Sequence, residues 1–256
     1  MTFKLLGLGL VPLLVTGCLS SEKQIQDALE RNPDLIFKVI ENNPEKFVTT
    51  VNSAVRKAQE AQTANRDRNL DKRIQEDLHK PKRPLLQAER TLVGVPGAEI
   101  VVVEWGDFQC PACAVGYQNF KSFKERYKDE MQFIFKHMPL DFHPMAKDAA
   151  LAFELIRMDS REKAMKFYEE CFAEPGAMNS EKDLEAIVKK VGYDWKTLKK
   201  SKRVPEAQKI IQADIEEFTK FGFNGTPSFI MNGVALPGAQ PPTMFDKIRD
   251  LTTAVK

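Results

Sequence analysis

The sequence predicts an α/β fold preceded by a small α-helical segment, and three observations support this class. From residue 92 onward, short runs rich in Val, Ile and Phe alternate with longer segments whose apolar residues recur at helical spacing. Residues 19–90 contain only helical patterns and become strongly charged after residue 59. The chain has 256 residues, of which 43% are hydrophobic, and this is enough for one sizeable core plus an appendage.

The overall charge of the chain is close to balanced. Lys and Arg number 38 and Asp and Glu number 36, which gives a net charge of +2. Because no basic surplus is present, we expect no nucleic-acid partner.

The first residues have the pattern of a bacterial export signal. Lys4 precedes an apolar run at residues 5–15 that is too short to span a membrane, and small residues then lead to Cys18. This ending resembles the lipobox, in which the cysteine is lipidated and becomes the first mature residue. An ordinary signal peptide with an incidental cysteine is the alternative. In both cases the protein is exported to a compartment that permits disulfides. We expect a lipid anchor on the periplasmic face of a bacterial membrane, and Leu19 favours the outer membrane over the inner.

The segment after the leader contains two signals for the start of a helix. Asn32-Pro33 and Asn43-Pro44 each place Asn at a capping position and Pro in the first turn. We therefore expect helices to begin at both positions.

A thin apolar stripe marks the charged stretch at residues 59–79. Only Leu70, Ile74 and Leu78 recur regularly there, as on a coiled coil or an exposed connecting helix. The helices of this segment are too few to bury their apolar faces alone, so they either dock on the main domain or pack against other subunits. We favour a homo-oligomer, because the charged stretch spaces them away from the main domain. The predicted domains are a leader at 1–17, a helical oligomerisation segment with a charged linker at 18–90, and a main domain at 91–256.

The main domain is predicted to contain strands and helices in a defined order. Strands are expected at residues 92–95, 100–105, 132–136, 228–231 and 234–236, with Asn232-Gly233 as a hairpin turn. Helices are expected at residues 115–127, 144–157, 161–173, 181–191, 206–221 and 242–255. A strand–helix–strand unit, a helical block, a hairpin and a final helix together fit a thioredoxin fold with a helical insertion.

Two cysteines lie where the second strand passes into the first helix of this domain. Pro111 occupies a first-turn position, where its missing N–H costs nothing, so Cys110 falls at the helix N-terminus. Free N–H groups and the positive end of the helix dipole favour a thiolate there. We expect Cys110 to be an exposed attacking sulfur and Cys113, one turn on, to be a buried resolving sulfur.

Other interpretations of the Cys-X-X-Cys motif are half of a zinc site or a structural disulfide. Zinc needs four ligands, and neither a second Cys-X-X-Cys nor a His pair is present. We favour thiol–disulfide exchange without a metal or another cofactor. The remaining cysteine of the main domain, Cys171, shares a helical face with Ala164, Phe167 and Tyr168 and is expected to be a buried free thiol.

Four segments resemble the DsbA-like branch of the thioredoxin superfamily. They are EWGDFQCPAC at 104–113, FKHMPL at 135–140, GTPSFIMNG at 225–233 and GAQP at 238–241. The resemblance covers roughly residues 92–256. The N-terminal helices are similar to those of ScsC-type proteins, in which such a segment oligomerises the catalytic domains.

The resemblance implies a substrate-binding loop at Thr226-Pro227, with a cis peptide bond, facing the cysteines. Pro111, Ala112, Thr226 and Pro227 would bind the substrate, and the Thr226 backbone would pair with an extended client as an added strand. An ordinary turn before a strand is the alternative for this loop.

Glu104 lies on the otherwise apolar strand that leads to the cysteines, where a carboxylate is costly without a task or a partner. It matches the buried acid of the family, which relays a proton to or from Cys113, and burial would raise its pKa toward neutrality. The alternative is a pairing with Lys136 on the neighbouring strand, and both roles can coexist. Asp107 and His137 are interpreted as polar residues near the rim of the site.

These inferences predict an exported thiol–disulfide oxidoreductase that uses Cys110 and Cys113. Its direction remains open between disulfide isomerase or reductase and oxidase. Expected partners are cysteine-containing client proteins and a redox partner protein in the membrane. The alternative function is a copper- or other metal-handling lipoprotein that uses the same two thiols as soft ligands.

Overall fold

A computed structural model describes residues 21–253 of the chain. It divides into two compact units, one that ends at Asp67 and one that begins at Arg68. The predicted leader and the lipidation of Cys18 lie outside the described residues. Between residues 21 and 253, no helix is both long and apolar enough to cross a membrane.

The helices of the first unit are separated at prolines. α1 spans Ser21–Arg31, α2 spans Asp34–Asn42, and α3 (Pro44–His79) begins in this unit and ends in the second. Helix starts at the two Asn-Pro pairs are therefore confirmed. α2 starts without a side-chain cap hydrogen bond. The Asn43 amide donates to the Val39 carbonyl at 3.0 Å and so caps the end of α2.

Many large apolar side chains of the first unit remain exposed. α2 has no buried residue. The exposed apolar residues, which we call the apolar N-terminal surface, are Ile25, Leu29, Leu35, Ile36, Phe37, Val39, Phe47, Val48, Val51 and Val55.

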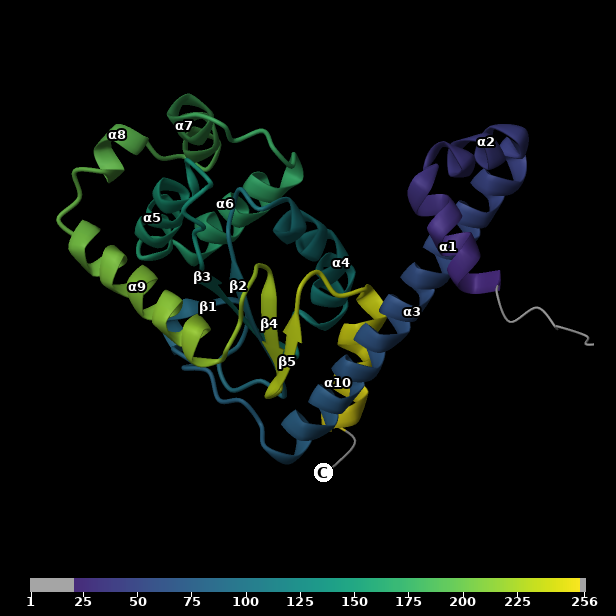
Figure 1. Ribbon diagram of the computed structural model, residues 1–256. Coiled ribbons are helices and arrows are strands. Elements are labelled where there is room, and N and C mark those ends of the chain that lie inside the picture. The colour runs from purple at the N-terminus through teal and green to yellow at the C-terminus, as the bar shows by residue number, and fades with distance from the viewer. Residues whose placement is uncertain (1–20, 254–256) are drawn as a thin grey trace, which may run out of the picture. The chain divides into compact units, whose positions relative to one another are not determined.

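The second unit contains a five-stranded mixed sheet with strand order β1-β3-β2-β4-β5 (Figure 1). β2 and β3 are parallel, and the other neighbouring pairs are antiparallel. The strands are β1 (Thr91–Gly94), β2 (Ile100–Gly106), β3 (Met131–His137), β4 (Ser228–Met231) and β5 (Val234–Pro237). The hairpin between β4 and β5 turns at Asn232 and Gly233, both with positive φ, as the Asn-Gly pair predicts.

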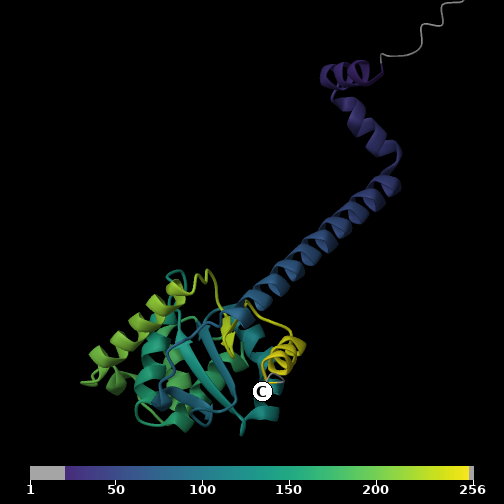
Figure 2. The same cartoon turned by 90° about the horizontal axis from the view of Figure 1, so that it is seen from below.

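Helices cover both faces of this sheet. α4 (Pro111–Tyr127) and α10 (Pro242–Thr253) pack with Phe133 and Phe229 in the main core, while α9 (Val204–Lys220) covers Trp105 and Ile134 on the opposite face. Figure 2 shows the sheet between α9, in light green, and α10, in yellow. The helical insertion consists of α5 (Ala146–Arg157), α6 (Arg161–Ala173), α7 (Glu181–Lys190) and α8 (Trp195–Leu198). These elements confirm the predicted fold class, although the four-residue α8 is too short to give a periodic signal.

The last turns of α3 belong to the second unit. Ile74 is 1% exposed, and Leu70 and Leu78 pack against the main core. Asp77 is also buried and accepts a hydrogen bond from the Ala235 N–H of β5 at 2.9 Å. The thin apolar stripe is therefore a docking stripe at this end of α3, and the interpretation of an exposed connecting helix is wrong for these turns.

Side chains and loops occupy both edges of the sheet. Arg161, at the start of α6, donates to the carbonyls of Leu92 and Gly94 in β1 at 3.2 and 3.1 Å. At the β5 edge, Asp77 takes the Ala235 N–H and the Lys82 N–H donates to the Gly233 carbonyl at 2.8 Å. Exposed backbone N–H and C=O groups at a sheet edge can pair with other chains. These side-chain and loop contacts occupy several of these groups at both edges.

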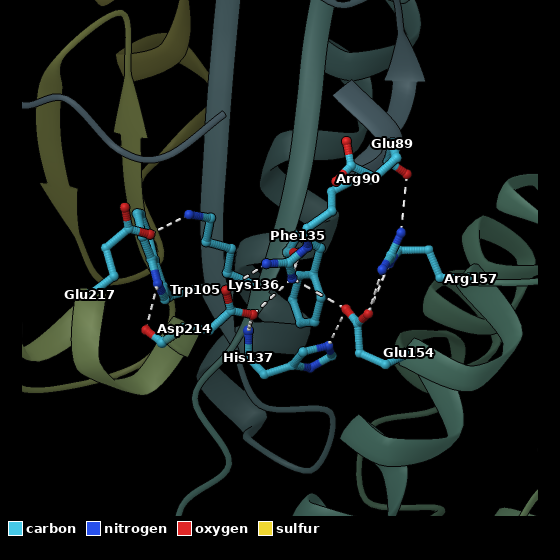
Figure 3. A network of polar contacts seen from close by, with 10 residues as sticks. All are labelled: Glu89, Arg90, Trp105, Phe135, Lys136, His137, Glu154, Arg157, Asp214 and Glu217. Atoms are coloured by element: carbon cyan, nitrogen blue, oxygen red, sulfur yellow. Dashed lines mark hydrogen bonds and ion pairs between the residues drawn. The ribbon is translucent and has the colours of Figure 1, made fainter. Parts of the chain in front are cut away.

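A buried network of charged side chains joins β3 to α5 and α9 (Figure 3). Arg90 donates to the two carboxylate oxygens of Asp214 at 2.6 and 2.7 Å and to Glu154 at 3.2 Å. Glu154 also accepts from Arg157 and contacts His137 Nε2 at 3.0 Å. Burial disfavours the ionised form of Glu154, but the neighbouring His137, Arg90 and Arg157 outweigh it and lower the pKa of this carboxyl. The network fixes the end of β3, from which the loop beside the cysteines departs.

Candidate active site

The cysteine motif lies at the junction predicted from the sequence. β2 ends at Gly106 and α4 begins at Pro111, with Cys110 at the N-cap position in extended conformation (φ −71°, ψ 119°). The Cys110 carbonyl accepts hydrogen bonds from the N–H groups of Cys113 and Ala114 at 3.0 and 3.2 Å. A sulfur at this position faces the unpaired N–H groups of the first turn, which favour an anion.

The local hydrogen bonds lower the pKa of the Cys110 thiol to about 5. The largest contribution is a hydrogen bond from the Cys113 side chain. Burial opposes it, and Thr226 together with the backbone N–H groups of Cys113 and Ala112 adds to the lowering. Cys110 is buried, with 8% of the residue exposed, so the prediction of an exposed sulfur is wrong. The residue is covered on one side by the loop at Thr226, whose carbonyl oxygen lies 3.6 Å from Sγ.

Cys113 has the opposite environment from Cys110. It has no exposed surface, and burial, reinforced by the neighbouring Cys110 sulfur and Glu104, raises the pKa of its thiol well above the ordinary value. The Asp107 N–H lies 3.5 Å from its Sγ and partly offsets this effect. The two thiols therefore differ strongly in acidity, as an attacking and a resolving sulfur require.

The loop before β4 closes the other side of the motif. The Thr226–Pro227 peptide bond is cis, as the resemblance implies. Pro227 packs so closely on α4 that a Cβ on Gly116 would lie 2.8 Å from the Pro227 ring. Gly116 therefore permits this approach, and nothing in the sequence pattern of the helix indicates its role.

Glu104 is completely buried on the side of the sheet that faces α4 and α6. The Tyr168 hydroxyl donates to its Oε2 at 2.6 Å, and burial raises the pKa of Glu104 to about 8 despite this bond. The predicted pairing with Lys136 is wrong. Lys136 is opposite Trp105 in the parallel register, and successive residues of a strand point to opposite faces, so Lys136 lies on the α9 side and pairs with Glu217.

Asp107 and His137 are buried at 2% and 1% exposure, so the prediction of a position near the rim is wrong for both. The Asp107 carboxylate accepts hydrogen bonds from the backbone N–H groups of Gln109 and Leu140 at 2.7 and 2.8 Å, and it contacts His143 Nδ1 at 2.7 Å. Asp107 thus joins the cysteine loop to the loop after β3. The sequence gives no signal for this contact, because its partners lie far apart in the chain.

The prediction that Cys171 is a buried free thiol is confirmed. Cys171 is a free, buried thiol in α6, and burial raises its pKa well above the ordinary value. No group of three or more His, Cys, Asp or Glu side chains suited to a metal ion occurs in the described part of the chain.

The family model described as Thioredoxin matches residues 87–250. The chain belongs to this family, because the match covers well over half of it. Its mixed sheet with a helical insertion has the fold of a solved thioredoxin-like oxidoreductase from Silicibacter pomeroyi, which is 24% identical with a TM-score of 0.56 over 63% of this chain and 90% of that one.

Relatives by sequence fall into two groups. The chain is 27% identical over 157 residues to "Na(+)/H(+) antiporter NhaA 1" of Mycobacterium sp. (strain KMS), a match that covers 59% of this chain and 25% of the antiporter. The chain therefore spans about a quarter of the length of these relatives. It is also 28% identical over 158 residues to "Probable disulfide bond formation protein D" of Bacillus cereus, with 55% of this chain and 69% of that protein covered.

Solved structures of the same fold include several bacterial proteins. The catalytic domain of Proteus mirabilis ScsC is 22% identical, with a TM-score of 0.56, and the match covers 66% of this chain and 91% of that one. A linker-deletion mutant of the same ScsC is 20% identical, with a TM-score of 0.56, over 93% of this chain and 99% of that one. The thiol-disulfide exchange protein α-DsbA2 of Wolbachia pipientis is 20% identical, with a TM-score of 0.56, over 62% and 84% of the two chains. At these identities the likeness defines the fold.

Proposed function

We propose that the protein is an exported thiol–disulfide oxidoreductase that acts on cysteines of client proteins. The observation that carries this proposal is the contrast between two adjacent thiols: the pKa of Cys110 is lowered to about 5, while that of Cys113 is raised well above its ordinary value. At neutral pH Cys110 is a thiolate and Cys113 keeps its proton. Such a pair supports attack by one sulfur and resolution by the other.

The chemistry in the reducing direction takes two exchanges. The Cys110 thiolate attacks a client disulfide, forms a mixed disulfide and releases one client sulfur as a thiolate. Cys113 then gives up its proton and attacks Cys110, which forms the Cys110–Cys113 disulfide and releases the second client sulfur. The two electrons pass from the cysteine pair to the client, and the reverse sequence oxidises a client dithiol.

Client binding is assigned to the surface around Cys110. Pro111, Ala112, Thr226 and Pro227 border the sulfur, and an extended client can hydrogen-bond to the Thr226 backbone as an added strand. A backbone-based contact of this kind is independent of client sequence, which suits an enzyme with many clients.

Two features bear on the direction of the reaction. The acidic Cys110 thiol stabilises the reduced pair, which makes the disulfide more oxidising. The apolar N-terminal surface supports a homo-oligomer, in which several sites on one scaffold engage a misfolded client repeatedly, and this favours isomerase or reductase activity. A stabilised reduced pair together with repeated contact with one client fits an isomerase better than a reductase. We infer an isomerase anchored by lipidated Cys18 to the periplasmic face of the outer membrane, with a membrane redox partner that resets the cysteines.

Client turnover tests the function directly. Refolding of a disulfide-scrambled client should occur with the wild-type protein and with Cys171→Ser, and it should be lost in Cys110→Ser. Turnover that persists in Cys110→Ser would reject the proposal. No turnover by the wild-type protein would favour the metal-handling alternative. The reduction potential of the pair then separates oxidase from isomerase or reductase.

The oligomer has its own test. Val51→Asp places a charge on the apolar N-terminal surface and should lower the molar mass measured by light scattering. Thr50→Asp, at the neighbouring exposed position, is the control that adds the same charge outside the apolar set. Equal masses for wild type and Val51→Asp would contradict assembly through this surface.

A further inference from the structure

The carboxylate of Glu104 has one bonded oxygen and one free oxygen. Its Oε2 accepts the hydrogen bond from the Tyr168 hydroxyl at 2.6 Å, while Oε1 has no hydrogen-bond partner in the part of the chain that the structure describes. Glu104 and Tyr168 are both 0% exposed. A buried carboxyl group with a single polar contact depends on that contact for its orientation.

The free oxygen lies beside Gly106, at the end of the strand that leads to the cysteine loop. Oε1 is 3.5 Å from the position that a Cβ on Gly106 would take, and the next residue, Asp107, directs its N–H at Cys113 Sγ at 3.5 Å. Glu104 is also close enough to Cys113 for its charge to raise the pKa of that thiol. The unbonded oxygen therefore lies next to the backbone that contacts Cys113, the residue whose proton must move.

No basic side chain fixes Glu104 in the described structure. Lys136 is directed to the other face of the sheet, where it pairs with Glu217 and lies 5.2 Å from the centre of the Trp105 ring. The position that a cation would take beside the buried acid is filled by the neutral hydroxyl of Tyr168.

We propose that Tyr168 is a positioning residue for Glu104: its hydroxyl holds Oε2 and thereby leaves Oε1 to exchange the proton of Cys113 during the resolving step. This inference rests on the proposed function. In that step the Cys113 proton passes to the Glu104 carboxylate, a bond forms between the Cys113 and Cys110 sulfurs, and the client sulfur leaves as a thiolate. Proton and electron pairs balance without a further reactant.

The hydroxyl also sets the fraction of Glu104 that can accept a proton. A hydrogen bond donated to a carboxylate stabilises the charged form, so Tyr168 lowers the pKa of Glu104 from the value that burial alone would give. Removal of the hydroxyl should raise this pKa by about one unit, which leaves ~10-fold less carboxylate at neutral pH.

A single-turnover reaction with Ellman's reagent isolates the resolving step. Reduced protein releases a first equivalent of thionitrobenzoate when Cys110 attacks the reagent and a second when Cys113 resolves the mixed disulfide. Stopped-flow measurement of the second phase against pH gives the midpoint of the Cys113 step. The variant is Tyr168→Phe, and the matched control is Tyr117→Phe, whose ring packs 5.5 Å from that of Tyr168 but lacks a described bond to Glu104.

The expected result is specific to one hydroxyl and one acid. Tyr168→Phe should move the midpoint of the second phase upward by about one pH unit and slow it ~10-fold at neutral pH, while Tyr117→Phe keeps the wild-type midpoint. In a Glu104→Gln background, Tyr168→Phe should have no further effect. A wild-type midpoint in folded Tyr168→Phe, or the same shift in the Glu104→Gln background, would overturn the inference.

A second measurement tests the inference if Tyr168→Phe does not fold. Biosynthetic fluorotyrosine makes each tyrosine hydroxyl a stronger hydrogen-bond donor. It should therefore move the midpoint of the second phase downward in wild type and in Tyr117→Phe, and an unchanged midpoint would count against the role of Tyr168.

Failure of the proposed function gives a different result. A wild-type protein that releases no second equivalent rejects the Cys110–Cys113 exchange itself, whatever the tyrosine variants do.

Discussion

The acidity of Cys110 can be tested by the removal of its main hydrogen-bond donor. The largest cause of the lowered pKa is the hydrogen bond from the Cys113 side chain, and Cys113→Ala removes it while the helix N-terminus remains. Burial of Cys110, which raises the pKa, is then less strongly opposed. The pKa of Cys110 should therefore rise, but it should stay below the ordinary value of a free thiol, about 8.5.

The size of the rise follows from the energy of the lost bond. A hydrogen bond to a charged group contributes about 1.5–3 kcal/mol, and one pKa unit corresponds to about 1.4 kcal/mol. The pKa of Cys110 should move upward by about one to two units from its wild-type value of about 5. Cys113→Ser keeps a hydroxyl donor at the same position and should give a smaller rise.

Alkylation by iodoacetamide measured against pH reports this pKa, because only the thiolate reacts. Cys171 does not interfere, since it is buried and its pKa is raised. Equal midpoints for wild type and Cys113→Ala would refute the role of the Cys113 donor and leave the helix N-terminus as the cause. A wild-type midpoint near the ordinary value would refute the thiolate mechanism as a whole.

Three other changes test the buried acids and the end of α3. Asp214→Asn should destabilise the domain by about 3–5 kcal/mol in urea unfolding, because it removes an ion-pair partner of the buried Arg90; a loss below about 1 kcal/mol would contradict a role for this pair. Glu104→Gln should gain stability relative to wild type as pH rises from 4.5 toward 8, up to about 5 kcal/mol, because folded Glu104 has a pKa of about 8 and retains a proton that the unfolded chain releases above 4.5; parallel stability curves would refute the raised pKa. Ile74→Ala should destabilise the domain by about 2–5 kcal/mol, whereas Gln62→Ala, at an exposed polar position of the same helix, should change it by less than about 0.5 kcal/mol; equal effects in thermal unfolding would contradict the docking of these last turns.

The sequence predicts the elements of the main domain well because their signals are local. Apolar runs, the Asn-Gly turn and the proline after Cys110 each depend on a few neighbouring residues, and the structure has strands and a helix at these positions. The stripe of α3 was misinterpreted for a similar reason. Periodicity shows that Ile74 has an apolar neighbour but does not show whether that neighbour is another subunit or the same domain.

The site is predictable only where its chemistry is carried by adjacent residues. Cys110 and Cys113 are one motif, and the helix start predicts which of the two is the more acidic, although the hydrogen bond from Cys113 and the burial of Cys113 cause most of the contrast. The partner of Glu104 was not predictable, since Tyr168 is brought to it by the helical insertion across the sheet. The alternative pairing of Glu104 with Lys136 fails for a geometric reason, because a neighbouring strand alone does not determine which face of the sheet a side chain occupies.

The covered sheet edges have a consequence for the proposed action on misfolded clients. Misfolded clients present unpaired strands, and an open edge of the sheet would bind these strands. Because the edge lies away from the cysteines, such binding would not lead to thiol–disulfide exchange. With Arg161 on β1 and Asp77 on β5, the backbone of an incoming chain finds fewer competing places to pair. Non-productive capture is thereby reduced, and in the proposed homo-oligomer the same protection limits aggregation among neighbouring catalytic domains.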